Sequence, residues 1–169
     1  MPAFTCLFPG RFQPFHKGHL LVVQGMRKMC GKIVIAIGSS DKSGNAENPF
    51  TAEERRDMMQ RALQGEDIIP AFDVVFITVP DMADDQEWGK AVLEAAGEVH
   101  QVWSGNADVQ ETFKKLGVEV KNIKPVPGIS ATEVRKRIKE GGDWQSIVPE
   151  EVASSIKAID GVERVKKLG

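Results

Sequence analysis

The sequence predicts an α/β fold in which a parallel sheet is covered by helices on both faces. Apolar runs of strand length alternate along the chain with segments whose apolar residues recur at helical spacing. The run 32–37 (KIVIAI) is β-branched and almost entirely apolar, as expected for a strand covered on both faces, and the run 74–79 has the same character. Strands separated by helices form right-handed βαβ units. We therefore expect a Rossmann-like open parallel sheet of about five strands.

Each element follows from its own pattern. The expected strands cover residues 4–8, 32–37, 74–79, 99–103 and 118–123, with the weakest patterns in the last two. The expected helices cover residues 18–30, 51–63, 86–96, 107–116, 131–140 and 150–159, with a short helix in the tail. Thr51 and Ser130 each precede a Glu by three residues, which is capping-box spacing, and Gly31 and Gly117 stand where helices should end. The loop 39–48, rich in Gly, Ser, Asn and Asp, is either a mobile lid or a plain surface loop.

Length, charge and cysteine content restrict the class of protein. The 169 residues, 41% hydrophobic and 27% charged, suit one domain with one buried core. The net charge of -2 gives no overall basic field for nucleic acid or an anionic membrane, and no apolar run approaches the roughly 20 residues of a spanning helix. We expect Cys6 and Cys30 to form neither a disulfide framework nor a metal knuckle. With no signal peptide evident, they favour a reducing cytosol and hence a cytoplasmic location.

The most informative segment is 10–19, GRFQPFHKGH, which follows the first strand and begins a helix. A helix start at this position presents backbone N–H groups to an anion. Gly10 allows a tight exit from the strand, and Gly18 removes a Cβ where a ligand could approach. His16 and His19, three residues apart, can face the same side of the first turn. Because the helix dipole disfavours a charged imidazole there, neutral rings that donate N–H bonds to phosphate oxygens are expected.

Two other interpretations of the histidine pair have to be weighed. The pair could bind a metal, but the only other histidine is His100, and no cysteine or acidic cluster completes a site. The pair could also serve only to pack the start of the helix. The two common phosphate loops, GxGxxG and GxxxxGK[ST], do not occur in the chain. Phosphate binding by the histidines is therefore the favoured interpretation.

A second helix start lies at 129–135, ISATEVR. Ser130 is the expected cap, so the N–H groups of Ala131 and Thr132 are free to bind an anion. Thr132 and Arg135 share the polar stripe of that helix, and Arg is suited to forked contact with phosphate. Taken alone, this stretch fits a capped helix with a solvated arginine equally well. Two such helix starts in one chain favour a polyphosphate site.

These motifs carry a family resemblance. HKGH resembles the HxGH signature of nucleotidyltransferases related to class I aminoacyl-tRNA synthetases, and ISATEVR resembles their ISxTxxR signature. Four blocks in order resemble the archaeal nicotinamide-mononucleotide adenylyltransferases, with near-constant spacing from Phe4 to the end of the chain. These blocks are GRFQPFHKGH at 10–19, NPFTAEER at 48–55, WSGN at 103–106 and GVER at 161–164.

The resemblance implies a reaction and a set of site residues. ATP and nicotinamide mononucleotide (NMN) would give NAD and pyrophosphate, with Mg²⁺ held mainly by the ATP phosphates. His16, His19 and Arg135 would be catalytic. ATP would be bound by Gly10, Arg11, Phe12, Gln13, Lys17, Gly18, Gly105, Asn106, Ser130 and Thr132. Residues 1–169 would form a single nucleotidyltransferase domain with C-terminal helices from about 143 packing on it. Its partners would be ATP and a mononucleotide, without nucleic acid or membrane, and it would form a homo-oligomer.

The resemblance also assigns the acceptor side. Trp88 matches a tryptophan expected to stack on the nicotinamide ring, although it could simply pack on an amphipathic helix. Asp85 stands where the family often has Asn. Ile129, Ala131 and 43–45 (SGN) also depart from the usual pattern. An Asp can accept from a carboxamide but repels a carboxylate, so we expect nicotinate mononucleotide to be the poorer substrate. The alternatives are an adenylyltransferase for flavin mononucleotide or phosphopantetheine, a cytidylyltransferase, or a non-catalytic nucleotide sensor.

Overall fold

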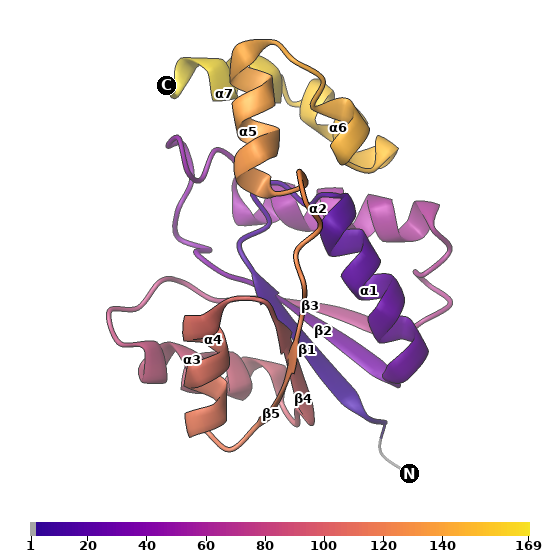
Figure 1. The fold of residues 1–169 in the computed structure, drawn as a ribbon, viewed down its shortest axis with the longest axis vertical. Helices are drawn as coiled ribbons and strands as arrows, with labels where there is room; N and C mark the ends of the chain where they lie inside the picture. Colours follow the sequence, from indigo (N-terminus) through magenta and orange to yellow (C-terminus); the bar gives the residue numbers. More distant parts are fainter. Residues whose placement is uncertain (1–2) are drawn as a thin grey trace.

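The computed structural model describes residues 3–169, and within them the strands form one five-stranded sheet in which every pairing is parallel (Figure 1). The strands are β1 (Thr5–Gly10), β2 (Lys32–Ile37), β3 (Val74–Thr78), β4 (Gln101–Ser104) and β5 (Glu119–Asn122). Their order in the sheet is β3-β2-β1-β4-β5. The order reverses between β1 and β4, and open α/β sheets bind ligands outside the carboxyl ends of the strands at this switch point. The predicted fold class is confirmed.

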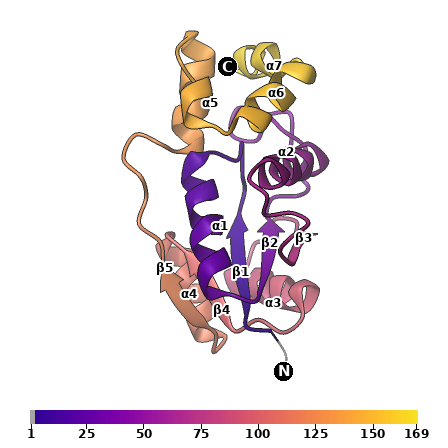
Figure 2. The same ribbon diagram turned by 90° about the vertical axis from the view of Figure 1, so that its right-hand side faces the viewer.

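Helices cover both faces of the sheet. The helices are α1 (Lys17–Met29), α2 (Ala52–Gly65), α3 (Asp85–Ala96), α4 (Ala107–Lys115), α5 (Ala131–Glu140), α6 (Glu150–Ala158) and α7 (Gly161–Lys167), with a 3₁₀ turn η1 (Gln145–Ile147). Helices α1 and α2 lie on one face and α3 and α4 on the other, while α5, α6 and α7 group at one end (Figures 1 and 2). The arrows of β1 and β2 point toward that end (Figure 2). The sequence located every one of these helices and strands, with most boundaries shifted by one or two residues.

Successive residues of the inner strands face two separate apolar clusters. Ile33 and Ile35 of β2 join the cluster under α1 and α2, whereas Val34 joins the cluster under α3 and α4. This two-faced burial explains the continuous apolar run at 32–37. The similar run at 74–79 is not buried in the same way, because β3 is an edge strand and Val75 is 37% exposed.

The expectation that Cys6 and Cys30 form no disulfide framework is wrong. Cys6 of β1 and Cys30, the C-cap of α1, form a disulfide, with their Cα atoms 6.0 Å apart. Helix α1 runs back along β1, so its C-terminal end returns to the start of the strand, and the Gly31 N–H donates to the Phe4 carbonyl there. Counting cysteines in the sequence gave no information on this contact. The two cysteines therefore give no support for a reducing compartment.

The predicted capping boxes differ in outcome. At Thr51 both bonds of the box are present: the Thr51 hydroxyl accepts from the Glu54 N–H, and the Glu54 carboxylate accepts from the Thr51 N–H. Ser130 accepts from the Glu133 N–H, but the Glu133 carboxylate pairs with Arg137, one turn along the helix, at 3.0 Å. The reciprocal half of that box was thus predicted incorrectly, because a charged partner one turn away takes the carboxylate.

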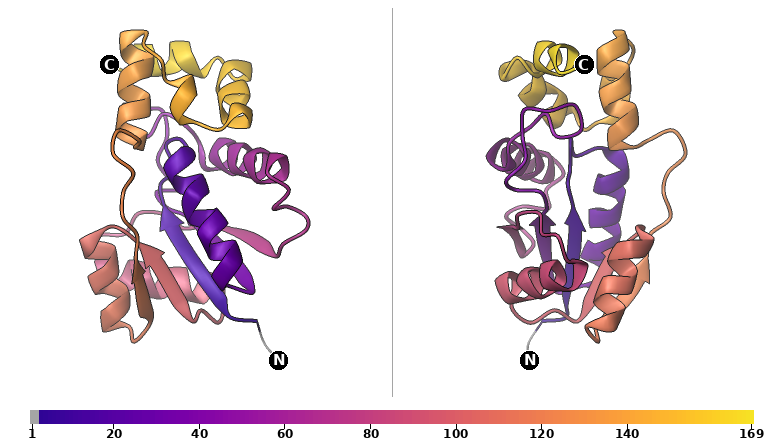
Figure 3. Two further views of the ribbon diagram at one scale, coloured as in Figure 1. Left: turned by 45° about the vertical axis from the view of Figure 1, so that its right-hand side comes forward. Right: turned by 90° about the vertical axis from the view of Figure 1, so that its left-hand side faces the viewer.

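The C-terminal helices are tied to the start of α2. Helix α6 packs against α2, and α7 packs against α5 and α6 (Figure 3). Arg164 of α7 donates to both carboxylate oxygens of Glu54, at 2.6 and 2.9 Å, and to the Pro49 carbonyl, and it lies over the Phe50 ring. Among residues 3–169, no helix has both the length and the apolar character needed to cross a bilayer.

We predict that Arg164→Ala lowers the free energy of unfolding by about 1–2 kcal/mol, measured by urea denaturation. The variant loses the bidentate ion pair with Glu54 and the hydrogen bond to the Pro49 carbonyl. Water reaches both partners of the ion pair, which reduces the free energy that the pair contributes to stability. Arg61→Ala is the matched control, because Arg61 pairs with Asp57 on the exposed surface of α2. Its effect should stay within about 0.5 kcal/mol. Equal losses for the two variants would contradict the anchoring role of Arg164.

Candidate active site

Two cavities open at the carboxyl ends of β1 and β4, where the strand order reverses. One, of about 380 Å³, contains His16 and His19 and is called the histidine pocket. The other, of about 490 Å³, contains Trp88 and is called the tryptophan pocket. Both are lined by Pro9, Ser104 and Asn106. The two cavities are therefore adjoining parts of one crevice.

Three helix N-termini meet at the histidine pocket. His16, Asn106 and Ser130 are the N-caps of α1, α4 and α5, and all three line this pocket. Each cap uses a side-chain acceptor to satisfy backbone N–H groups of its own first turn. Each helix also directs the positive end of its dipole toward the same space. The pocket is therefore suited to an anionic ligand.

The two histidines cap their helix reciprocally. The Nδ1 atom of His16 accepts from the N–H groups of Gly18 (3.0 Å) and His19 (3.3 Å), and the Nδ1 atom of His19 accepts from the His16 N–H (3.2 Å). A nitrogen that accepts a hydrogen bond carries no proton, so both neutral rings hold their proton on Nε2. The rings stack with centroids 3.6 Å apart.

The surroundings keep both histidines neutral. Burial lowers the pKa of His16 from 6.5 to about 4. Burial, and then the neighbouring His16, lower the pKa of His19 well below 6.5. Both Nε2–H groups are therefore hydrogen-bond donors at neutral pH, as the position of the pair at a helix start predicts.

Aromatic side chains hold the His19 ring in place. Phe12 and Phe15 lie on its sides, with centroids 4.8 and 5.5 Å from that of His19, and both are almost fully buried. Gly18 has a related function: a Cβ at this position would meet the His16 ring at 2.9 Å. The sequence predicts that Gly18 leaves room for a ligand, whereas in the structure the His16 imidazole itself occupies the space.

Arg135 is brought to the segment before the histidines. Its guanidinium donates to the Gln13 carbonyl at 2.8 Å and reaches the Thr132 hydroxyl at 3.4 Å. Burial, and then the nearby charge of Arg11, lower the pKa of Arg135. The two motifs, far apart in sequence, thus meet on one side of the molecule.

Gln13 has a structural contact that the sequence did not indicate. Its side-chain amide donates to the Phe50 carbonyl at 2.9 Å and accepts from the Phe50 N–H at 3.0 Å. The side chain is 1% exposed. Gln13 therefore pairs with a peptide unit as a β-ladder residue would, and its amide group faces the protein interior.

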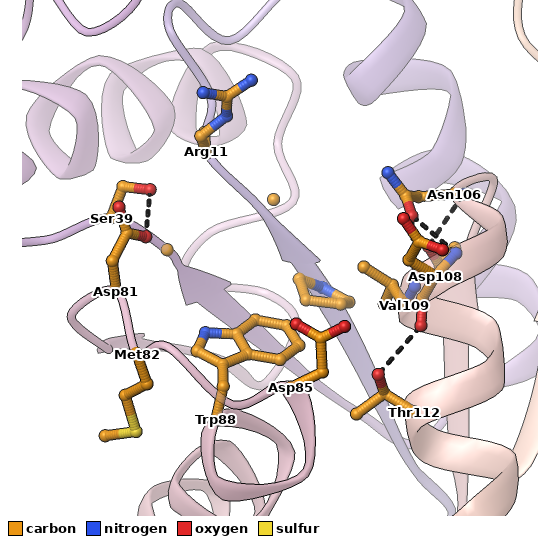
Figure 4. Close-up of a pocket in the computed structure, with 14 residues that line it drawn as sticks. Arg11, Ser39, Asp81, Met82, Asp85, Trp88, Asn106, Asp108, Val109 and Thr112 are labelled. Atoms are coloured by element: carbon orange, nitrogen blue, oxygen red, sulfur yellow. Dashed lines mark hydrogen bonds between the residues drawn. The ribbon is translucent and has the colours of Figure 1, made fainter.

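The tryptophan pocket combines an indole ring with carboxylates. Figure 4 shows Trp88 and Asp85 side by side, with Arg11 at the opposite end of the cavity. Asp81 and Asp108 are the other acidic side chains in its lining. The pocket thus offers a flat aromatic surface, three carboxylates and one guanidinium. This combination suits a planar, cationic or neutral ring joined to an anionic group.

The predicted site residues divide into three groups. The histidine pocket is lined by His16, Gly18, His19, Gly105, Asn106 and Ser130. The tryptophan pocket is lined by Gly10, Arg11, Asp85 and Trp88, and also by Asn106. Five residues contribute to neither lining: Phe12 and Gln13 lie buried, Lys17 and Thr132 are exposed, and Arg135 bonds to Gln13.

The lining residues that the sequence did not predict include two loop segments. Residues 123–126, between β5 and α5, form a wall of the histidine pocket, and Ser39, bonded to Asp81 at 2.6 Å, lines the tryptophan pocket. Both segments directly follow strands. Their position at the carboxyl ends of parallel strands was the available signal.

The donor atoms do not suit a metal held by the protein alone. Among the described residues, no three His, Cys, Asp or Glu side chains gather closely enough to hold an ion. In the histidine pair both Nδ1 atoms already accept backbone N–H groups. The arrangement fits a divalent ion carried into the site by a polyphosphate ligand.

Comparisons with known proteins agree with this geometry. A family profile described as cytidylyltransferase-like matches residues 7–137. The nicotinamide-nucleotide adenylyltransferase of Thermococcus onnurineus is 38% identical over 165 residues, covering 96% of this chain and 87% of the relative. The enzyme of the same name from Methanococcus maripaludis (strain C6) is 36% identical, covering 94% and 92%.

Among solved structures, the chain resembles a bifunctional NMN adenylyltransferase/ADP ribose pyrophosphatase from Francisella tularensis, complexed with AMP and a manganese ion. The TM-score is 0.73 at 24% identity, covering 99% of this chain and 52% of that one. This chain thus spans about half of the bifunctional protein, and the likeness concerns the fold. From the family profile and the archaeal relatives together, the chain belongs to the cytidylyltransferase-like family and, within it, to the nicotinamide-nucleotide adenylyltransferases.

Proposed function

We propose that this protein transfers the adenylyl group of ATP to nicotinamide mononucleotide, giving NAD and pyrophosphate. The observation that carries the proposal is the pair of adjoining pockets that share Pro9, Ser104 and Asn106. One pocket has neutral N–H donors and three helix N-termini, as a nucleoside triphosphate requires. The other has an indole and carboxylates beside a single guanidinium, as a pyridinium mononucleotide requires. The names of the archaeal relatives support the same reaction.

The proposed reaction needs no general base. The attacking group is the phosphate of the mononucleotide, which is already anionic at neutral pH. The P–O bond to this phosphate forms as the bond from the α-phosphorus to the leaving pyrophosphate breaks. The chain then has to position the two reactants in line and stabilise charge on the α-phosphoryl oxygens.

The histidine pair fits that task. The Nε2–H groups of His16 and His19 are free to donate to the α-phosphate oxygens, because each Nδ1 is held by a backbone N–H. Low pKa values keep both rings neutral, so they act as hydrogen-bond donors and hold the same proton throughout. We assign the triphosphate to Arg135, Lys17 and the helix starts at Gly18, Asn106, Ser130 and Thr132, with Gly10, Phe12, Gln13 and Gly105 shaping the site. The sequence predicts that Arg11 binds ATP, but Arg11 lines the tryptophan pocket and not the histidine pocket, so we assign its guanidinium to the phosphate of the acceptor mononucleotide.

Mg²⁺ is proposed as the metal, held mainly by the ATP phosphates. When bound, it would offset charge on the phosphate oxygens of the leaving pyrophosphate. The residues named above supply the remaining donors. For the acceptor, we assign the nicotinamide ring to Trp88 and its carboxamide N–H₂ to Asp85. Pyrophosphate release from ATP and Mg²⁺ with nicotinamide, nicotinate or flavin mononucleotide, or phosphopantetheine, tests the function directly, and NMN should rank first.

We predict that His19→Ala reduces turnover by about 10²–10³-fold while the fold survives, because one preorganised donor is lost. Pyrophosphate release measures the rate, and circular dichroism with urea unfolding measures the fold. Leu21→Ala is the control on the same helix, because Leu21 is 55% exposed. Near-normal turnover of the His19 variant would remove this residue from the mechanism.

We predict a pH dependence of stability that originates from His16. Its pKa is about 4 in the folded protein and 6.5 as the ordinary value. Between these values the unfolded chain binds more protons, so stability falls as the pH drops below 6.5. Between pH 7 and pH 5 the loss from this residue should be on the order of 1–2 kcal/mol. His16→Asn keeps an N-cap acceptor but does not titrate. Between pH 7 and pH 5, its free energy of unfolding, measured with urea, should therefore fall by about 1–2 kcal/mol less than that of the wild-type protein. Identical pH dependence in both proteins would contradict the low pKa.

We predict that Asp85→Asn narrows the preference for nicotinamide over nicotinate mononucleotide. Removing the negative charge removes a repulsion of about 1 kcal/mol at this exposed position, which corresponds to about fivefold in the ratio of kcat/KM values. Glu87→Gln, on the same turn of α3 but outside the pocket lining, is the control and should leave the ratio unchanged. An unchanged ratio in Asp85→Asn would show that this carboxylate does not face the acceptor ring.

A further inference from the structure

Arg55 of α2 is the largest fully buried side chain, with no exposed surface. Its guanidinium donates to four backbone carbonyls: Nη1 to Arg11 (2.7 Å) and Gly38 (2.8 Å), Nη2 to Ser39 (3.1 Å) and Nε to Thr51 (3.2 Å). A guanidinium has five N–H groups in a fixed plane, so four carbonyls nearly exhaust it.

Three of the four carbonyls bound by Arg55 belong to residues that line the tryptophan pocket, and the fourth belongs to Thr51, the N-cap of α2. Arg11 directly follows β1, Gly38 and Ser39 directly follow β2, and all three line that pocket. Ser39 holds a left-handed φ of 49° and donates to the Asp81 carboxylate, which follows β3. One buried side chain thus bonds to the segments that leave β1 and β2, and Ser39 connects it to the segment that leaves β3. Because these backbone segments are held in place, they determine the position of the Arg11 Cα atom, from which the side chain extends. They also determine the orientation of the Ser39–Asp81 pair.

Arg55 also places a charge beneath the pocket. All four of its hydrogen-bond acceptors are neutral carbonyls, so no bonded anion cancels the charge. Burial, and then the charge of Arg11, lower its pKa to about 10, while Asp81 acts in the opposite direction. The side chain therefore remains protonated at neutral pH. A buried positive charge below the end of the pocket that holds Arg11 favours an anion there.

We infer that Arg55 is a positioning residue for the acceptor mononucleotide, acting through Arg11 and the Ser39–Asp81 pair. The inference rests on the proposed function, because it assigns the acceptor to the tryptophan pocket. The histidine pocket has no lining residue bonded to Arg55, so the ATP side should be little affected.

The test is steady-state kinetics of Arg55→Ala and Arg55→Lys with both substrates varied. Misplacement of a positioned group by about 1 Å can cost on the order of 10²-fold, so kcat/KM for NMN should fall about 10–100-fold in Arg55→Ala. The KM for ATP should stay within about threefold. Guanidinium ion, at concentrations far below those that unfold the protein, should restore part of the loss, and the same concentration of sodium chloride should not. Arg61→Ala, on the exposed face of α2, is the matched control and should be unaffected.

If Arg55→Ala does not fold, the kinetics of Arg55→Lys test the positioning role of Arg55. Lysine keeps the charge, but one Nζ cannot span carbonyls on the ends of both β1 and β2. It should therefore show the same NMN-specific loss to a smaller degree. An equal loss of kcat/KM for NMN and for ATP would overturn the inference. A value of kcat/KM for NMN within about threefold of the wild-type value would overturn it as well.

A readout in the free protein separates this inference from the proposed function. The Ser40 N–H bonds to the Val79 carbonyl, and the Asp81 N–H bonds to the Asp41 carboxylate. Hydrogen exchange at these two amides should accelerate in the Arg55 variants, while exchange at the Gly18 and His19 amides stays unchanged. If wild-type protein made no NAD, the proposed function would fail, and these exchange rates would still decide whether Arg55 holds the pocket. Unchanged exchange at Ser40 and Asp81 would overturn its positioning role.

Discussion

The backbone of residues 11–16 is the constraint on which the site depends. This segment connects β1 to α1, and residues 12–16 are buried, so its peptide groups cannot rely on water. A buried peptide group without a partner costs about 1–3 kcal/mol. The carbonyls of Arg11 and Gln13 therefore accept from Arg55 of α2 and Arg135 of α5. The bond from Arg55 holds the start of the segment beside the end of β1, whereas the bond from Arg135 holds the segment close to His16, the N-cap of α1.

The same bonds shape the electrostatics of the crevice. The guanidinium groups of Arg55 and Arg135 donate hydrogen bonds to the buried segment 11–16. They also place positive charge beside it. Arg11 lies close enough to lower the pKa values of both Arg55 and Arg135, so like charges gather here. Three helix N-termini add their dipoles at the histidine pocket. Neutral histidines avoid adding a further charge next to these groups. A cluster of like charges is costly in the free protein, and an anionic ligand relieves it.

Local patterns in the sequence were sufficient to predict the helices, the strands and the position of the histidine pair at a helix start. These features depend on spacings of two to four residues, as between His16 and His19. Other features depend on contacts between residues 24 or more positions apart, for which one sequence carries no pattern. These are the edge position of the strand at 74–79, the Cys6–Cys30 disulfide and the hydrogen bonds between Gln13 and Phe50. Arg55 did leave a signal. It stands on the stripe of Met58, Met59 and Ala62, all buried, where a charged residue has to find partners.

The arrangement of the sheet has a consequence for the geometry of group transfer. In-line displacement at phosphorus needs the entering and leaving oxygens on opposite sides. After β1 the chain turns to α1 on one face of the sheet, and after β4 it turns to α4 on the other (Figure 1). The histidine pocket includes residues of α1 and the tryptophan pocket includes residues of α3 and α4, so the two proposed ligands would reach the shared residues Pro9, Ser104 and Asn106 from the two faces of the sheet. The reversal of strand order thus provides the opposed approach that the proposed chemistry requires.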